Sequence, residues 1–264
     1  MPRFEPHPQR RTAVVTGASS GIGAATAIAL ATAGHPVALG ARRAGRCEEL
    51  AATIRAGGGE AIGLPLDTSD DVSVKTFTET VASELGPAEI LVNAAGDLAP
   101  QPVHEVDPAE FLRQLQVNLV GAQRLVSAIV PGMITRQRGD VVLISSDVLR
   151  VPRPRMGGYV AAKHGIEGMA RAMQMELEGT GVRVSIVRPG PTMTGMGMNW
   201  DAETTQAVLG DWVKWGLARH PYFLRPADVA AAVTTVVSAP RGCHLTLIEI
   251  EPEAPLAARQ EAPS

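Results

Sequence analysis

Apolar and polar positions alternate in blocks along almost the whole chain. Short apolar runs predict β-strands that are covered on both faces, because such strands read as continuous apolar segments. The longer segments between them carry apolar residues at helical spacing. The predicted strands span residues 13–16, 37–40, 61–66, 90–93, 141–145, 182–187 and 245–250. The predicted helical stretches include residues 24–33, 71–85, 110–134 and 159–178.

This alternation predicts an α/β fold, since parallel strands are joined by helical crossovers that cover both faces of the sheet. We expect a Rossmann-like three-layer αβα sandwich around a seven-stranded parallel sheet, with six or more helices. The 264 residues, 45% of them apolar, show no break in composition, so a single domain is predicted. We expect this domain to span residues 11–251. An arm at 1–10 would precede it, and a tail at 252–264 would be disordered or cross to a neighbouring subunit.

Charge and composition exclude several classes of function. The net charge of −3 and the pI of about 6.1 leave no basic field for nucleic acid. The polar, proline-rich first residues hold no apolar signal segment, and no run approaches the ~18 apolar residues of a membrane span. Cys47 and Cys243 have neither CxxC nor metal-ligand spacing. We therefore expect no metal site, no membrane partner and free thiols in a reducing cytoplasm.

A glycine-rich turn follows the first predicted strand and opens a helix. Gly17, Gly21 and Gly23 let the backbone turn tightly and approach a pyrophosphate. The helix N-terminus adds N–H groups and the positive end of its dipole. The pattern predicts a dinucleotide site, the alternative being a turn with no ligand. The candidate residues are Gly17, Ser19, Ser20, Gly21, Ile22 and Gly23, with the serines as hydroxyl donors and Ile22 anchoring the turn in the core.

The end of the second predicted strand bears on the choice of cofactor. The ribose 2′-hydroxyl of NAD(H) favours a carboxylate there, but residues 39–43 contain none. Arg42 and Arg43 offer guanidinium groups, which suit a 2′-phosphate, so NADP(H) is predicted in preference to NAD(H). Alternatively the arginines are solvated charges at a helix start, which fits Arg43 better than Arg42. Asp67, just past the third strand, would either reach an adenine or cap the helix beginning near Ser69.

Tyr159 and Lys163 are four residues apart and share one face of a predicted helix. A free tyrosine has a pKa of about 10, and a nearby ammonium favours its phenolate form. This moves the phenol toward the range of a general acid–base. Ser146 ends a buried strand, at the edge where parallel sheets bind ligands. Its hydroxyl can hold a carbonyl oxygen as charge develops.

Together these motifs resemble the classical short-chain dehydrogenase/reductase family over about residues 11–250. Residues 16–23 match the family's cofactor motif, and Asn118 matches its helix asparagine. Ser146, Tyr159 and Lys163 match the remaining catalytic positions. Two further matches are the strand-four motif, Asn93-Ala94-Ala95-Gly96, and the nicotinamide-side loop, Arg188-Pro189-Gly190 with Thr194. At Ala94 the family often has a second asparagine, a departure that concerns a contact between strands rather than the chemistry.

The resemblance implies a role for each catalytic residue. Tyr159 would exchange a proton with a carbonyl or alcohol oxygen, and Ser146 would hold the same oxygen. Lys163 would bind the nicotinamide ribose and lower the pKa of the tyrosine. Asn118 would hold a water that links Lys163 to solvent, by locally distorting its helix. Hydride would pass directly between the nicotinamide and the substrate, with no metal.

The resemblance also assigns the remaining cofactor contacts. The strand-four motif would follow the adenosine ribose, and the Thr194 hydroxyl with nearby backbone would orient the carboxamide. The family further implies a homotetramer or a homodimer. The cofactor residues that follow are Asn93, Ala94, Ala95, Gly96, Tyr159, Lys163, Pro189, Gly190, Thr192 and Thr194.

By the same resemblance, residues 191–224 are the substrate lid. The segment is rich in methionine and aromatic residues, which supply adaptable apolar surface. An apolar or bulky carbonyl substrate is therefore expected, unless these side chains pack on the core or on a partner subunit. Just before the catalytic helix, Arg153 and Arg155 either meet an anionic substrate or are solvated. The lid residues concerned are Met193, Met196, Met198, Trp200, Trp212, Trp215, Tyr222 and Phe223.

The sequence thus predicts an NADP(H)-dependent oxidoreductase acting on a small-molecule carbonyl compound or secondary alcohol. An NAD-dependent alcohol dehydrogenase of the same family is the first alternative. A non-catalytic nucleotide-sensing regulator is the second, although such proteins usually lose the tyrosine or the lysine that this chain keeps. An epimerase or dehydratase of the extended branch would need a longer substrate domain.

Overall fold

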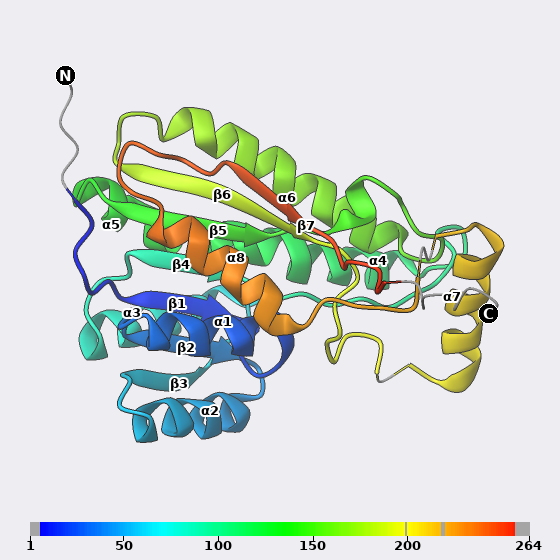
Figure 1. Ribbon diagram of the computed structural model, residues 1–264, viewed down its shortest axis with the longest axis horizontal. Coiled ribbons are helices and arrows are strands. Elements are labelled where there is room, and N and C mark those ends of the chain that lie inside the picture. Colours follow the sequence, from blue (N-terminus) through cyan, green and yellow to red (C-terminus); the bar gives the residue numbers. More distant parts are fainter. Residues whose placement is uncertain (1–5, 199, 218–219, 257–264) are drawn as a thin grey trace, which may run out of the picture.

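A seven-stranded parallel sheet forms the centre of the computed structural model, which describes residues 6–198, 200–217 and 220–256. Its strand order is β3-β2-β1-β4-β5-β6-β7 (Figure 1). The inner strands β1, β2, β4 and β5 are buried throughout, whereas the edge strands β3 and β7 are partly exposed. The strands are β1 Ala13–Thr16, β2 Val37–Ala41, β3 Ala61–Pro65, β4 Ile90–Asn93, β5 Gly139–Ile144, β6 Val182–Pro189 and β7 Leu247–Ile250.

Helices cover both faces of this sheet. One face packs against α1 Gly21–Thr32, α2 Ala44–Ala56 and α8 Pro226–Ser238. The other packs against α3 Asp71–Glu84, α5 Gly121–Thr135 and α6 Gly157–Glu176. Two further helices, α4 Pro108–Leu115 and α7 Ala202–Lys214, lie toward the carboxyl ends of the strands (Figure 1). The predicted fold class, a single three-layer α/β domain, is confirmed.

Local sequence sets where several helices begin. Asp70, Asp107 and Asp201 accept hydrogen bonds from backbone N–H groups in the first turns of α3, α4 and α7. Such caps satisfy donors that have no partner inside the helix, and each contributes about 1 kcal/mol. Pro108 and Pro226 open α4 and α8, where a missing N–H costs nothing.

The element bounds differ from the predicted ones by no more than three residues, with one change of kind. Residues 110–134, predicted as a single helical stretch, contain the π-helical turn Gln116–Val120 (η1) between α4 and α5. Apolar spacing does not reveal such a turn, because the residues on either side keep a helical period.

The helical stretch Pro108–Thr135 is apolar and long enough, by composition and length, to cross a bilayer. Its apolar residues Leu125, Ile129 and Met133 are nevertheless buried in the core cluster beneath the sheet. This placement is that of a core helix, and it accounts for the apolar composition without a membrane.

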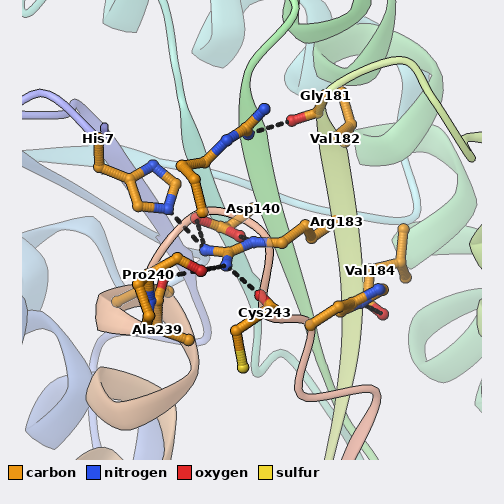
Figure 2. A network of polar contacts seen from close by, with 12 residues as sticks. His7, Asp140, Gly181, Val182, Arg183, Val184, Ala239, Pro240 and Cys243 are labelled. Carbon is orange, nitrogen blue, oxygen red and sulfur yellow. Dashed lines mark hydrogen bonds and ion pairs between the residues drawn. The ribbon is translucent and has the colours of Figure 1, made fainter. Parts of the chain in front are cut away.

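A buried polar network lies at the amino-terminal ends of β5 and β6 (Figure 2). Asp140 accepts hydrogen bonds from Arg183 at 2.7 and 3.1 Å and also pairs with Arg11. The Arg183 guanidinium donates to three backbone carbonyls that follow α8, and to the imidazole nitrogen of His7 at 2.8 Å. The described part of the predicted arm is therefore attached to the body of the domain.

We expect acid to loosen this attachment through His7. Burial, helped by the nearby Arg11 charge, lowers the pKa of His7 from 6.5 to about 4. Between these values the unfolded chain binds a proton on His7 and the folded chain does not, so stability falls as the pH decreases from 6.5 toward 4. Urea unfolding at pH 7 and pH 5 should show a larger loss for the wild type than for His7→Gln, whose amide oxygen still accepts from Arg183. Equal losses would mean that His7 does not contribute.

Candidate functional site

The predicted nucleotide-binding turn lies at the carboxyl end of β1, where the strand order reverses toward β4. Gly17 and Gly21 have φ of +65° and +56°, values that L side chains rarely adopt. A Cβ on Gly17 would lie 2.8 Å from the Ala94 carbonyl oxygen, and one on Gly23 would lie 2.5 Å from the Gly17 oxygen. Ile22 packs against the core. These glycines hold the turn tightly against β4 and leave the start of α1 open.

The strand-four motif is joined to this turn by Thr16. The Thr16 hydroxyl donates to the Asn93 side chain at 3.0 Å and accepts from the N–H groups of Ala94 and Ala95 at 3.1 and 3.0 Å. Alanine at position 94 thus still contributes through its backbone. Gly96, the last residue of the motif, faces Asn118, whose Oδ1 would lie 3.1 Å from a Cβ placed there. The turn, the end of β4 and the distorted helix therefore meet at one place.

Arg43, rather than Arg42, contacts the glycine-rich turn. Its guanidinium donates to the hydroxyls of Ser19 and Ser20 at 3.0 and 2.9 Å. Arg42 is exposed, and its charge helps to keep the pKa of Asp67 low. Arg43 is exposed as well, so burial does not separate the two arginines, and a 2′-phosphate contact of either one stays a prediction.

Asp67 closes a local turn. Its carboxylate accepts from the N–H and the hydroxyl of Ser69 at 2.9 and 2.6 Å, and the hydroxyl bond is the main reason that its pKa is lowered. α3 begins at Asp71 and is capped by Asp70. The alternative that Asp67 caps this helix is therefore wrong, and a contact with adenine stays a prediction.

Asn118 is fully buried within the π-helical turn η1. Its amide nitrogen donates to the carbonyls of Gln114 and Asp97, both at 2.8 Å, and its oxygen accepts from the Asp97 N–H at 3.0 Å. The carbonyl of Gln114 is available to the side chain because the helix is widened at this point. The local distortion that the resemblance implied is present in the structure.

Ser146, Tyr159 and Lys163 come together at the carboxyl end of β5. The Ser146 hydroxyl lies beside the Tyr159 phenol and lowers its pKa. The Lys163 ammonium donates to the Ile144 carbonyl at 2.7 Å and lies 5.4 Å from the centroid of the Tyr159 ring. Tyr159 and Lys163 are only 8% and 4% exposed, so this small polar group is shielded from water on most sides.

Burial governs the titration of this group. It raises the pKa of Tyr159 to about 12, against the opposing effect of the Ser146 hydroxyl. It lowers the pKa of Lys163 to about 8. In the protein alone the phenol is therefore protonated at neutral pH and able to donate. An added positive charge beside it would lower the phenol pKa.

The neighbouring Ser145 belongs to a separate polar network. It is buried and donates to Glu167 of α6 at 2.7 Å. Arg188 of β6 binds the same carboxylate with two hydrogen bonds, at 2.9 and 2.7 Å, and also reaches Glu249 of β7. This network holds the ends of β5, β6 and β7 against α6, beneath the catalytic hydroxyls.

The loop after β6 returns to the nucleotide end. The Thr192 hydroxyl donates to the Gly190 carbonyl at 2.8 Å, just past Pro189. Thr194 reaches the start of α1, since its Cβ would lie 3.2 Å from a Cβ on Gly21. The structure thus brings the predicted nicotinamide-side loop next to the predicted pyrophosphate turn.

The predicted lid divides into two sets of side chains. Trp200 and Trp212 pack into an apolar cluster with Tyr159 and with Val208 of α7. Trp215 is 62% exposed, at the end of the same helix. Trp200 and Trp212 thus pack on the domain, whereas a substrate-binding role for the exposed lid residues stays a prediction. The other methionine and aromatic side chains of the lid that are exposed are Met193, Met196, Met198, Tyr222 and Phe223.

Sequence reasoning missed an ion pair beside the catalytic hydroxyls. Arg153 is 8% exposed and binds Asp147, the residue after Ser146, with both of its terminal nitrogens. The interpretation of Arg153 as solvated is therefore wrong, and Arg155 pairs with Asp211 of α7. The sequence contains one indication of this pair, an aspartate after Ser146 and an arginine six residues later. That spacing alone does not show that the loop folds back and brings the two charges together.

Comparison with known proteins agrees with this geometry. The family model described as short chain dehydrogenase matches residues 11–205. The chain belongs to the short-chain dehydrogenase family. It is therefore an oxidoreductase of a family that acts on alcohol and carbonyl compounds with a nicotinamide cofactor.

Three similar proteins illustrate the relationship. Glycine betaine reductase ATRR of Emericella nidulans is 38% identical over 243 residues, which cover 92% of this chain but only 19% of that protein. The 2,3-dihydro-2,3-dihydroxybenzoate dehydrogenase of Bacillus subtilis is 31% identical, with 90% of this chain and 92% of the relative covered. The solved alcohol dehydrogenase of Thermococcus sibiricus, in complex with 5-hydroxy-NADP, has a TM-score of 0.78 at 30% identity. The match covers 91% of this short-chain dehydrogenase and 96% of the solved chain.

Proposed function

We propose that the protein is an NADP(H)-dependent oxidoreductase that interconverts a carbonyl compound and a secondary alcohol, with Tyr159 as general acid–base. The neighbouring hydroxyls of Tyr159 and Ser146, with Lys163 beside the phenol ring, carry this proposal. They lie at the same sheet edge as the glycine-rich turn, which is where a parallel α/β sheet binds its ligand.

The side chains divide the work of the reduction. NADPH, when bound, supplies the hydride that adds to the substrate carbon. Ser146 holds the carbonyl oxygen, and Tyr159 donates its phenolic proton to that oxygen as negative charge develops there. The Lys163 ammonium stabilises the phenolate that is left. In the oxidation the proton moves in the reverse direction, since the Tyr159 phenolate accepts it from the alcohol.

The glycine-rich turn fits a dinucleotide. Its backbone is too close to β4 and to itself for any side chain at Gly17 or Gly23. The N-cap residue Ser20 makes no side-chain capping bond, and the first turn of α1 holds no acidic residue. An uncapped helix start of this kind favours a phosphate.

Arginine at the end of β2 supports NADP(H) as the cofactor. No carboxylate occupies residues 39–46, and Arg43 lies across the serines of the turn. A guanidinium in that place suits a ribose 2′-phosphate and offers nothing that selects a 2′-hydroxyl. NAD(H) as the cofactor is the alternative. The cytoplasmic location and the assembly as a homotetramer or homodimer stay predictions.

We expect Arg43→Ala to weaken NADPH binding about tenfold, about 1.4 kcal/mol, and NADH binding much less. Arg42→Ala should have the same direction with a smaller effect, since Arg42 does not contact the turn in this structure. Arg46→Ala is the matched control, because its side chain is 70% exposed and pairs weakly with Glu49. Nicotinamide fluorescence titrations measure all three. An equal loss for both cofactors would rule out a 2′-phosphate contact.

Turnover of a carbonyl panel with NADPH tests the proposed activity. The panel should contain aliphatic, cyclic and aryl ketones, because Trp200 and Trp212 place apolar surface beside Tyr159. Loss of nicotinamide absorbance that needs both the ketone and the Tyr159 hydroxyl is the expected result. NADPH binding without turnover of any ketone, or of the matching alcohols with NADP⁺, would favour the nucleotide-sensing regulator.

A further inference from the structure

The ion pair of Asp147 and Arg153 closes the loop between β5 and α6. Two hydrogen bonds join the guanidinium to the carboxylate, one of them 3.1 Å between Nη1 and Oδ1. Both residues are buried, Asp147 at 7% and Arg153 at 8% exposure. Removing one member of such a buried pair strongly destabilises the fold, because the other charge is left buried without a partner.

One carboxylate oxygen also connects the pair to the catalytic serine. The Ser146 hydroxyl donates to Asp147 Oδ1 at 3.2 Å, and this is the oxygen that Arg153 Nη1 binds. The guanidinium therefore limits how strongly the carboxylate attracts the serine hydroxyl. An unpaired Asp147 would hold that hydroxyl in the orientation that turns its proton away from a substrate oxygen.

The other face of the guanidinium meets the lid. The central carbon of Arg153 lies 5.1 Å from the ring centroid of Trp212 in α7, a cation–π contact. Trp212 packs against the apolar cluster that contains Tyr159. A single buried side chain thus contacts both the carboxylate beside Ser146 and the inner face of the lid helix.

Arg155 makes a second, separate contact with the lid. Its Nε donates to Asp211 at 2.8 Å, one residue before Trp212. Arg155 has φ of +64°, a value that side-chain-bearing residues rarely adopt, so its loop is held in this conformation by its contacts. Arg155 does not share the carboxylate of Asp147, which makes it a natural comparison for Arg153.

We propose that Arg153 is a positioning residue, which couples the lid helix α7 to the catalytic hydroxyls through its ion pair with Asp147 and its contact with Trp212. The inference rests on the proposed function of Tyr159 and Ser146. When α7 packs on Arg153, as in this structure, the guanidinium stays on Asp147 and weakens the hold of that carboxylate on the Ser146 hydroxyl, which can then turn to a substrate. When α7 moves away, the pair loses its apolar cover and water reaches the catalytic group.

The titration of Tyr159 distinguishes positioning from plain structural support. The Asp147 carboxylate raises the pKa of Tyr159, and the Arg153 guanidinium lowers it. Removing each charge should thus move the Tyr159 titration in opposite directions. Damage to packing alone would move it the same way in both variants, or not at all.

The chain has only two tyrosines, Tyr159 and Tyr222, so the titration can be read without turnover. In a Tyr222→Phe background with NADP⁺ bound, the carbon-13 resonance of the remaining tyrosine ring reports Tyr159 alone. We expect Arg153→Met to raise its apparent pKa by about one unit and Asp147→Asn to lower it by about one unit. Arg155→Met should leave it unchanged. Arg153→Lys, which keeps the charge, should restore most of the wild-type value.

Hydrogen exchange of residues 202–214 measures the lid in the same samples. We expect at least severalfold faster exchange in Arg153→Met and in Arg155→Met. In Asp147→Asn the exchange should keep the wild-type rate if Arg153 still covers Trp212. Shifts of the same sign in Arg153→Met and Asp147→Asn, or unchanged exchange in Arg153→Met, would overturn the proposal. If Arg153→Met does not fold, Asp147→Asn and Arg153→Lys decide it. A wild type that turns over no carbonyl or alcohol would refute the proposed function, while these two readouts would still test the coupling.

Discussion

Replacing Tyr159 by phenylalanine is expected to reduce kcat/KM by about 10²–10⁴-fold, the range typical of a lost general acid. The change removes one oxygen atom and keeps the ring that packs with Val208 and Trp212. The proposed proton donor disappears, while Ser146 and its contact with Asp147 remain. NADPH affinity should stay within about twofold, because the glycine-rich turn is untouched. Steady-state kinetics with the best ketone of the panel, together with a cofactor titration, measure both quantities.

Tyr222→Phe is the matched control for this experiment. It makes the same chemical change at the only other tyrosine, whose side chain is 51% exposed. Its kcat/KM should be close to that of the wild type. A Tyr159→Phe variant that keeps its activity would refute the assigned acid–base and leave Ser146 or a water as the proton donor.

Lys163→Met is expected to separate activity from stability. The ammonium would no longer stabilise the phenolate, so we expect at least a 100-fold fall in kcat/KM. The folded protein should nevertheless gain about 1–3 kcal/mol at pH 7, because burial lowers the pKa of Lys163 from 10.5 to about 8 and each unit corresponds to about 1.4 kcal/mol. Methionine fills the same space with no charge to desolvate, although the Ile144 carbonyl loses its donor.

The pH dependence of this gain provides the check. Above pH 8 the folded wild type releases the lysine proton and the unfolded chain still binds it, so wild-type stability rises between pH 8 and 10.5. The advantage of Lys163→Met should shrink over that interval in denaturant unfolding. A variant that is less stable than the wild type at pH 7 would show that the ammonium contributes more to folding than its burial costs.

Much of this architecture could be predicted because it follows from local patterns. Continuous apolar runs gave the inner strands, which are covered on both faces in the structure. The positions of Gly17 and Gly23 could be interpreted from sequence, because only glycine allows the backbone to approach so closely. Ser146, Tyr159 and Lys163 were found because a strand end and a helix turn fix where they lie.

The features that were missed depend on contacts between segments that lie apart in the sequence, or on which charged side chains pair with one another. Arg153 is a charged residue in a loop and was therefore expected at the surface. In the structure Asp147 and Trp212 enclose its side chain from two sides. The contact of Arg43 with the serines of the turn could not be predicted, since it depends on how α2 follows β2. The π-helical turn at Asn118 is invisible to apolar spacing, and only the family resemblance indicated a distortion there.

A titration of the wild-type protein with NADPH and with NADH, followed by nicotinamide fluorescence, tests the central claim most directly. It needs no substrate. We expect saturable binding of both, with NADPH at least tenfold tighter, about 1.4 kcal/mol. Equal affinities, or tighter NADH, would contradict the role given to Arg43 at the glycine-rich turn, and the absence of binding by either nucleotide would contradict the proposed enzyme.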